Sequence, residues 1–265
     1  MTTPAPTSVL LLRLAAPLQS WGDRSYFNRR ETRPEPTKSG VVGLVAAAVG
    51  RPRHAAIDDL AGLGLGIRVD QPGSLLRDYH TVSDHRGRPL LSAAVTAKGQ
   101  QKPTSPHKYT QITHRFYLQD AVFLAALEGH RDLITTLEHA LRRPAFPLAL
   151  GRRSCPPTQP LLLGQRTGSL EEALQAEPWQ ATPAARARWS RQNGDTAHIG
   201  LPATLDDPAG GEARADVPLS FAPTNRTFTT RRTRHTYLQA PTGLTPDPAR
   251  PPATGGHDPF ALLGW

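Results

Sequence analysis

Cysteine is almost absent from this chain, which carries a single thiol at Cys155. One thiol excludes an intrachain disulfide framework and any metal site built from several thiolates. This usage fits a reducing cytoplasm, and Cys155 fits a small buried residue better than a nucleophile. The ten histidines show no H-E-x-x-H or similar ligand spacing. We therefore expect neither a metal nor a cofactor.

Long apolar runs are also missing. The N-terminal run at 9–14 is interrupted by Arg13 and is too short for the core of a signal peptide. No segment approaches the roughly 20 apolar residues that span a bilayer. The glycines of G-L-G-L-G at 62–66 lie in a predicted strand, without the helix that a dinucleotide site needs. The sequence predicts a soluble, cytoplasmic protein.

Lysine is scarce, whereas arginine is abundant: of 31 basic residues, four are lysines. The formal net charge is +9, and acidic residues are missing from three windows, 85–119, 139–170 and 217–246. Arginine offers a planar fork for phosphates and stacks on bases, so this usage favours a nucleic acid as partner. A genome rich in G and C also raises the arginine content, and composition alone leaves that alternative open.

The spacing of apolar residues predicts a mixed α+β chain. Strands are expected at 8–14, 63–70, 75–82 and within 112–127, and helices at 39–50, 54–62 and 131–142. Ser39 is the expected N-cap of the first helix, and Gly50 its stop. The order β-α-β-β-α-β within residues 1–155 suggests a ferredoxin-like (RRM-like) domain, a fold that in some proteins binds RNA on its sheet.

Three further segments complete the predicted organisation. Residues 83–109 form a long polar and basic excursion, and such loops are usually functional or disordered. Residues 156–240 predict a smaller β-rich lobe. Residues 241–265 are dominated by proline, glycine, alanine and threonine, which predicts a disordered tail.

The loop at 15–36 combines arginines with aromatic residues just before a predicted helix. Its candidate contacts with an exposed base or phosphate are Trp21, Arg24, Arg29, Arg30 and Arg33, and Trp21 is expected to be partly a packing residue. A solvated charged loop is the alternative, which charge alone favours.

Two further motifs could hold phosphates. In P-T-K-S-G at 36–40, Lys38 and Ser39 lie beside the free N–H groups of a helix start, although ordinary helix capping explains the motif equally well. In G-R-R-S-C-P at 151–156, Arg152 and Arg153 could grip successive phosphates, or simply form a surface turn.

Two sets of residues could support acid–base chemistry on RNA without a metal. They are Tyr79 with His80, and His107 with Lys108 and Tyr109. A structural or RNA-contacting role is the alternative for both sets, and it is the one that we favour.

Four motifs in order along the chain resemble the CasD family of CRISPR-associated proteins. They read L-L-L-R-L-A-A-P-L-Q-S-W-G at 10–22, P-T-K-S-G-V-V-G-L at 36–44, L-R-D-Y-H-T-V at 76–82 and L-G-R-R-S-C-P-P-T-Q-P-L-L-L-G at 150–164. The resemblance implies a RAMP-type, ferredoxin-like domain with a thumb hairpin, here the excursion at 83–109. It also implies a non-catalytic, RNA-binding subunit of the type I-E Cascade complex, which takes part in antiviral defence.

The same resemblance implies the partners and the site. The subunit would hold the 5′ handle of CRISPR RNA (crRNA) and cap the backbone filament, beside the filament subunit CasC, the large subunit CasA and target DNA. The loop at 15–36, P-T-K-S-G and the pair Arg152–Arg153 would line the handle site, with Tyr79 and His80 at a splayed base. The thumb would contribute Lys102, His107, Lys108 and Tyr109. The alternatives are a metal-independent endoribonuclease that processes CRISPR repeat RNA and a scaffold that contacts protein alone.

Overall fold

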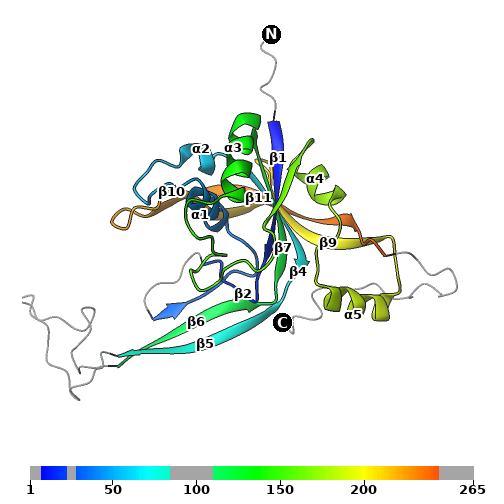
Figure 1. Cartoon of the computed structure of the whole chain (residues 1–265), viewed down its shortest axis with the longest axis horizontal. Helices are drawn as coiled ribbons and strands as arrows, with labels where there is room; N and C mark the ends of the chain where they lie inside the picture. The colour runs from blue at the N-terminus through cyan, green and yellow to red at the C-terminus, as the bar shows by residue number, and fades with distance from the viewer. Residues whose placement is uncertain (1–6, 23–27, 84–109, 245–265) are drawn as a thin grey trace, which may run out of the picture.

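The structure is a computed structural model that describes residues 7–22, 28–83 and 110–244. Its centre is an antiparallel sheet with the strand order β10-β11-β9-β4-β7-β1-β8 (Figure 1). These strands are β1 (Thr7–Ala15), β4 (Gly64–Gln71), β7 (Val122–His130), β8 (Leu162–Arg166), β9 (His198–Asp206), β10 (Glu212–Ser220) and β11 (Thr227–Pro241). Within the described ranges, no helix is long and apolar enough to cross a membrane.

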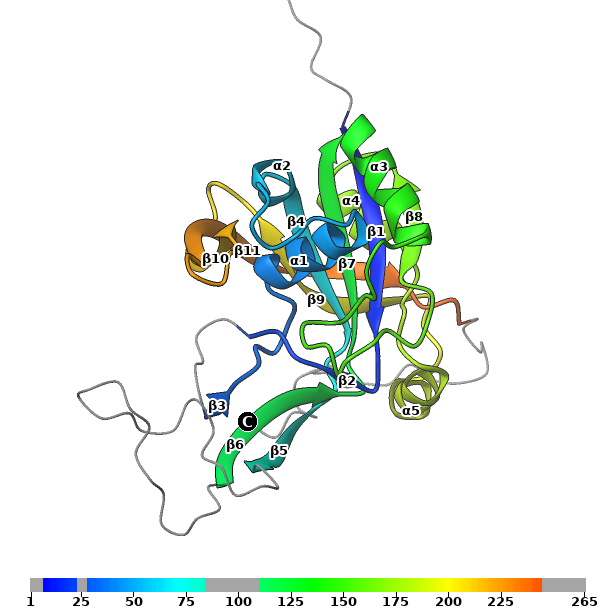
Figure 2. The same cartoon turned by 60° about the vertical axis from the view of Figure 1, so that its left-hand side comes forward.

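Helices cover both faces of the central sheet (Figure 2). On one face lie α1 (Lys38–Ala48), α2 (Asp58–Ala61) and α3 (Arg131–Arg142), and on the other lies α4 (Leu170–Ala176). Strand β1 is buried on both sides, because successive side chains of a strand point to opposite faces. Leu10 and Leu12 pack with the first group of helices, whereas Val9 and Leu11 pack with α4. This double burial explains the apolar run at 9–14.

Helices α1 and α3 lie near the positions that the sequence predicted. The predicted helix at 131–142 is confirmed as α3, which buries Ile134, Leu137 and Leu141 at helical spacing. The predicted cap of α1 is wrong: Thr37, not Ser39, is the N-cap, and its Oγ1 accepts a hydrogen bond from the N–H of Gly40. Ser39 already lies in the first turn, where its side chain is buried.

A second, smaller sheet carries a long two-stranded ribbon. Its strands are β2 (Leu18–Gln19), β3 (Arg29–Arg30), β5 (Ser74–Ser83) and β6 (Thr110–Gln119). Strands β5 and β6 pair in antiparallel register along their whole length, and the ribbon that they form projects from the body (Figure 1). The predicted excursion follows from the end of this ribbon, and its residues 84–109 lie outside the described part of the chain.

The mixed helix and strand content is confirmed. Elements β1, α1, β4, β7 and α3 follow one another in the expected order β-α-β-β-α, with β2, β3, α2 and the ribbon strands β5 and β6 between them. The last strand of the expected unit, β8, lies at Leu162–Arg166, beyond the predicted limit at residue 155. The finer assignment to the ferredoxin-like class stays a prediction.

The C-terminal half is organised differently from the expected smaller lobe at 156–240. Strand β8 pairs with β1, and β9 pairs with β4, so backbone hydrogen bonds join this segment to the N-terminal strands in one sheet. The segment also contains α4 and α5 (Pro183–Asn193), where Trp189 contacts Trp179 edge to face. Of the predicted tail at 241–265, all residues beyond 244 lie outside the described ranges.

A buried ion network joins the start of α1 to the C-terminal strands. The backbone N–H of Lys38 donates to the carboxylate of Asp216 at 2.8 Å, and Lys38 Nζ lies 2.9 Å from Asp206 Oδ2. Arg231 of β11 donates to both oxygens of Asp216, at 2.7 and 2.9 Å, and also contacts Asp206. A carboxylate at a helix N-terminus is further favoured by the helix dipole. Each charge therefore has a partner of opposite sign.

The ionisation of Asp216 contributes to stability. Burial alone would raise the pKa of Asp216, but the hydrogen bonds and charge of Arg231, together with the N–H of Lys38, outweigh burial and lower this pKa. A lowered pKa in the folded state means that the contribution is complete above the pKa of the unfolded chain. The contribution is lost as the pH falls through the folded pKa.

We predict that Asp216→Asn lowers the free energy of unfolding at neutral pH by about 3–5 kcal/mol, because it leaves the buried Arg231 short of negative charge. The variant should also lose less stability than the parent as the pH falls below about 4, because the amide does not titrate. Urea denaturation followed by circular dichroism measures both effects. Asp120→Asn, at an exposed carboxylate outside the helices, is the control and should change little. Equal stability of the Asp216 variant and the parent would contradict this role.

Candidate nucleic-acid interface

The expected phosphate site at 36–40 is already occupied by the chain's own carboxylates. The N–H of Lys38 binds Asp216, and its ammonium binds Asp206, with 7% of its side chain exposed. Ser39 is buried, and its hydroxyl lies 3.3 Å from Thr37 Oγ1. The assignment of Lys38 and Ser39 to a phosphate site is therefore corrected: both hold the fold together.

Trp21 belongs to the core. Its side chain is 1% exposed, and its indole N–H donates to Gln19 Oε1 at 3.1 Å. Its ring lies so close to Gly40 that a Cβ there would come within 2.7 Å of it. Trp21 thus packs beside the start of α1, and no exposed ring remains for a base. This corrects its assignment as a contact residue.

Arg152 acts as a clamp between two parts of the surface. Its guanidinium donates to the carbonyl oxygens of Phe116 at 3.1 Å and Arg30 at 2.7 Å, and it lies 4.7 Å above the ring of Tyr117. These contacts tie β3 to the ribbon strand β6. Arg153, its neighbour, is exposed. The predicted pair is thus divided, with Arg152 in a positioning role and Arg153 directed to solvent.

One face of the ribbon gathers aromatic rings and guanidinium groups, and we call it the ribbon face. Strand register pairs Tyr79 with His114 and Arg77 with Phe116, and directly paired residues share a face. The rings of Tyr79 and His114 lie 5.5 Å apart at 60°. Strand β3 runs beside β6 and sets Arg29 over the ring of Phe116, with 5.0 Å to the ring centre. Planar groups held in this way suit contact with exposed bases and phosphates.

Sequence analysis missed three members of the ribbon face: Arg77, His114 and Phe116. The sequence contained a signal for them, because alternate residues of a strand share a face. The L-R-D-Y-H-T-V motif at 76–82 predicts β5, the strand that pairs with β6. The pairing of β5 with β6 across 84–109 was the missing information.

The other predicted contact residues do not belong to the ribbon face or lie outside the described residues. His80 lies on the face opposite Tyr79, where its Nδ1 is 3.1 Å from Thr113 Oγ1. Arg30 is exposed on β3, and Arg33 is half-buried, with its N–H bound to the carbonyl of Trp21. The remaining predicted contacts lie outside the described residues: Arg24, Lys102, His107, Lys108 and Tyr109.

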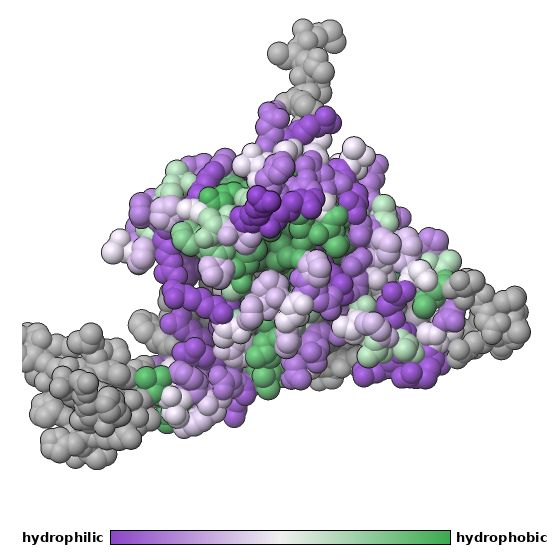
Figure 3. All heavy atoms as spheres, viewed as in Figure 1, coloured by the Kyte–Doolittle hydropathy of each residue, from purple (hydrophilic) through white to green (hydrophobic). Residues whose placement is uncertain are grey.

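The ribbon also exposes apolar side chains on both of its faces. Leu75, Tyr79 and Ile112 are 52%, 57% and 43% exposed on the ribbon face, and Leu76 and Val82 are exposed on the opposite face. Figure 3 shows hydrophobic side chains on this projection beside hydrophilic ones. Two strands cannot cover their own apolar residues, so the ribbon offers a surface for a partner.

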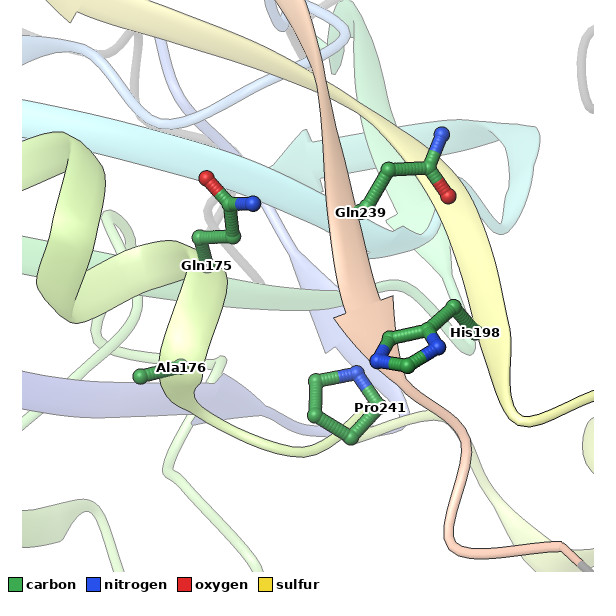
Figure 4. A pocket seen from close by; sticks show the side chains of 5 residues that line it. All are labelled: Gln175, Ala176, His198, Gln239 and Pro241. Carbon is green, nitrogen blue, oxygen red and sulfur yellow. The ribbon is translucent and has the colours of Figure 1, made fainter.

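A hollow elsewhere on the described surface has a different chemistry from the ribbon face. A hollow of about 490 Å³ lies at the end of α4, lined by Gln175, Ala176, His198, Gln239 and Pro241 (Figure 4). It contains neither an arginine nor a carboxylate. Among the described residues, no group of three or more His, Cys, Asp or Glu side chains could hold a metal ion.

Comparison with known proteins gives consistent results. A family model described as CRISPR-associated protein (Cas_Cas5) matches residues 9–234. The chain is 35% identical over 191 residues to the CRISPR system Cascade subunit CasD of Escherichia coli (strain K12), covering 64% of this chain and 78% of that protein.

Two solved structures are similar along almost the whole chain. One, described as a CRISPR RNA-guided surveillance complex, contains a chain with a TM-score of 0.70 and 32% identity, covering 91% of this chain and 95% of that one. The other, described as the crystal structure of a Cas protein, gives a TM-score of 0.64 and 36% identity, covering 89% and 98%. The resemblance to CasD that the four motifs indicated is thereby confirmed, and the chain belongs to the Cas5 family of CRISPR-associated proteins.

Proposed function

We propose that this chain is an RNA-binding subunit of a type I-E Cascade surveillance complex, in which it holds the 5′ handle of crRNA and caps the backbone filament. The similar E. coli protein is named as a Cascade subunit, and the similar solved chain belongs to a CRISPR RNA-guided surveillance complex. Both are more than 30% identical to this chain. The complex would act in the cytoplasm, in antiviral targeting of DNA.

The observation that carries this proposal is the ribbon face. Single-stranded RNA is bound through unstacked bases that lie on aromatic rings or guanidinium planes, and through phosphates paired with arginine. The pair of Tyr79 and His114 offers two rings, and the pair of Arg29 and Phe116 offers a cation held above a third. These groups come from strands β3, β5 and β6, so their spacing is set by backbone pairing.

The ribbon also supports the proposed protein partners. Exposed apolar residues on both of its faces can be buried against neighbouring subunits, which would be the filament subunit CasC and the large subunit CasA. In this proposal the central sheet forms the RAMP-type, ferredoxin-like body, and the ribbon is the described base of the thumb.

We expect Arg29→Ala combined with Arg153→Ala to weaken binding of RNA that carries the repeat-derived 5′ handle. The loss should be roughly 1.5–3 kcal/mol for each charge-assisted contact removed, and the salt dependence should become shallower. Fluorescence anisotropy of the full chain with labelled RNA measures both quantities. Arg53→Ala combined with Arg188→Ala removes the same charge from two other exposed arginines and is the control. If the parent binds RNA equally well with and without the handle, the proposal is wrong.

The proposal includes a non-catalytic role. General acid–base cleavage needs two groups within reach of one scissile phosphate. Tyr79 and His80 point to opposite faces of β5, and His80 Nδ1 contacts Thr113. This arrangement favours binding over cleavage by that pair.

Prolonged incubation of the purified chain with CRISPR repeat RNA in EDTA should leave the RNA intact, because Tyr79 and His80, the acid–base pair predicted on β5, point to opposite faces of that strand. Denaturing gel electrophoresis of end-labelled RNA checks this. Defined cleavage at one position, lost on Tyr79→Phe or His80→Ala, would instead establish a metal-independent ribonuclease.

A further inference from the structure

A second cationic surface lies on strand β11, away from the ribbon face. Alternate residues of this strand point to opposite sides of the sheet. On the inner side, Arg231 is paired with Asp206 and Asp216. On the outer side lie Phe228, Thr230 and Arg232, and the guanidinium of Arg226 in the preceding turn covers the ring of Phe228. We call Arg226, Phe228, Thr230 and Arg232 the outer stripe.

The charges on the two sides of β11 are compensated differently. Arg231 is 7% exposed at its side chain, and carboxylates surround it. Within the described part of the chain, neither Arg226 nor Arg232 has a carboxylate partner; Arg232 Nε donates to the carbonyl of Gly210 at 2.7 Å. Arg234, the next residue on the outer side, is neutralised by Glu171 and Asp207, and the stripe ends there.

The stripe is held by a rigid base. The ion network fixes β10 and β11 to the start of α1, while the turn between these strands projects from the body, apart from the ribbon in both views (Figures 1 and 2). Arg226 Cζ lies 5.2 Å from the ring centre of Phe228, within the range of a cation–π contact, and the side chain of Arg226 is exposed. Residues 217–246 contain no acidic residue that would oppose such an anion.

We propose that the outer stripe is a second binding surface for single-stranded nucleic acid. Arg226 and Arg232 bind phosphates, and Phe228, with the guanidinium above it, supports a base. From Phe228 to Arg232 the stripe follows β11 over about 13 Å at roughly 3.3 Å per residue, a length that two nucleotides of an extended strand can follow. The proposal rests on the proposed function in one respect: the chain is expected to bind nucleic acid at all.

The stripe is expected to accept either RNA or DNA, because its proposed contacts are to phosphates and stacked bases, which both share. Two probes of the same length and sequence therefore test it, a repeat-derived RNA and the corresponding single-stranded DNA. Binding of each to the full chain is measured by fluorescence anisotropy over a range of salt concentrations. Thermal melting by circular dichroism verifies that each variant is folded.

Arg226→Ala combined with Arg232→Ala should weaken binding of at least one probe roughly tenfold at low salt. The slope of log K against log salt should fall by about 0.7 for each lost phosphate contact, hence by about 1.4 for the pair. Phe228→Leu keeps an apolar side chain and should weaken binding without a change of slope, because stacking carries no charge. Arg53→Ala with Arg188→Ala is the matched control and should bind like the parent.

The outcomes separate this inference from the proposed function. If the stripe variant binds both probes like the parent while Arg29→Ala with Arg153→Ala weakens binding, the second surface does not exist and the proposed function stands. If both double variants bind like the parent, the proposed function fails as well. If the stripe variant loses a co-purifying protein while its salt slopes are unchanged, the stripe is a protein interface, and the inference is overturned.

Discussion

The fold depends on the ion network between the start of α1 and strands β9–β11. Asp216 lies 178 positions after Lys38, yet it receives the backbone N–H that opens the helix. Arg231 then holds Asp216 and Asp206 together, so that one helix and three strands meet at a single set of charges. Breaking a buried network costs more than forming it gains, because the remaining charges stay desolvated. The network therefore fixes α1 to the C-terminal strands, which backbone hydrogen bonds join to the central sheet.

The ribbon, in contrast to the central sheet, leaves much of its apolar surface uncovered. The central sheet is covered on both faces, whereas β5 and β6 leave Leu75, Tyr79 and Ile112 largely exposed. A two-stranded ribbon alone is marginally stable in water, and this one gains support from β2, β3 and the Arg152 clamp. Arg152 also sets the position of β3 and hence of Arg29 above Phe116. Arg152 thus fixes the arrangement of the ribbon face without needing to contact the proposed RNA itself.

Local patterns predicted the elements well, because helix and strand periodicity depends on neighbouring residues. The helix at 131–142 and the apolar run at 9–14 are examples. The same local reasoning assigned Lys38 and Ser39 to a phosphate site, because the N–H groups at a helix N-terminus and a nearby ammonium commonly bind phosphate. The carboxylates that occupy this helix start come from residues 206 and 216, and no local pattern reveals such a contact. Arg152 illustrates the same limit, because its contacts with the carbonyl oxygens of Phe116 and Arg30 join residues far apart in the sequence.

The arginines of this chain lie in two environments, inside the molecule with polar partners and on its surface. Arg68, Arg152 and Arg231 are committed to carboxylates or carbonyl oxygens inside the molecule. Every internal ion pair removes one charge of each sign, so pairing leaves the formal excess of nine cations unchanged. In the sequence, basic residues exceed acidic ones most in the three windows without acids, but Arg231 and Arg234 of the last window are paired with carboxylates from other elements. A polyanion therefore meets a few defined cationic surfaces rather than a uniformly basic protein, which makes the geometry of each surface more important than the net charge.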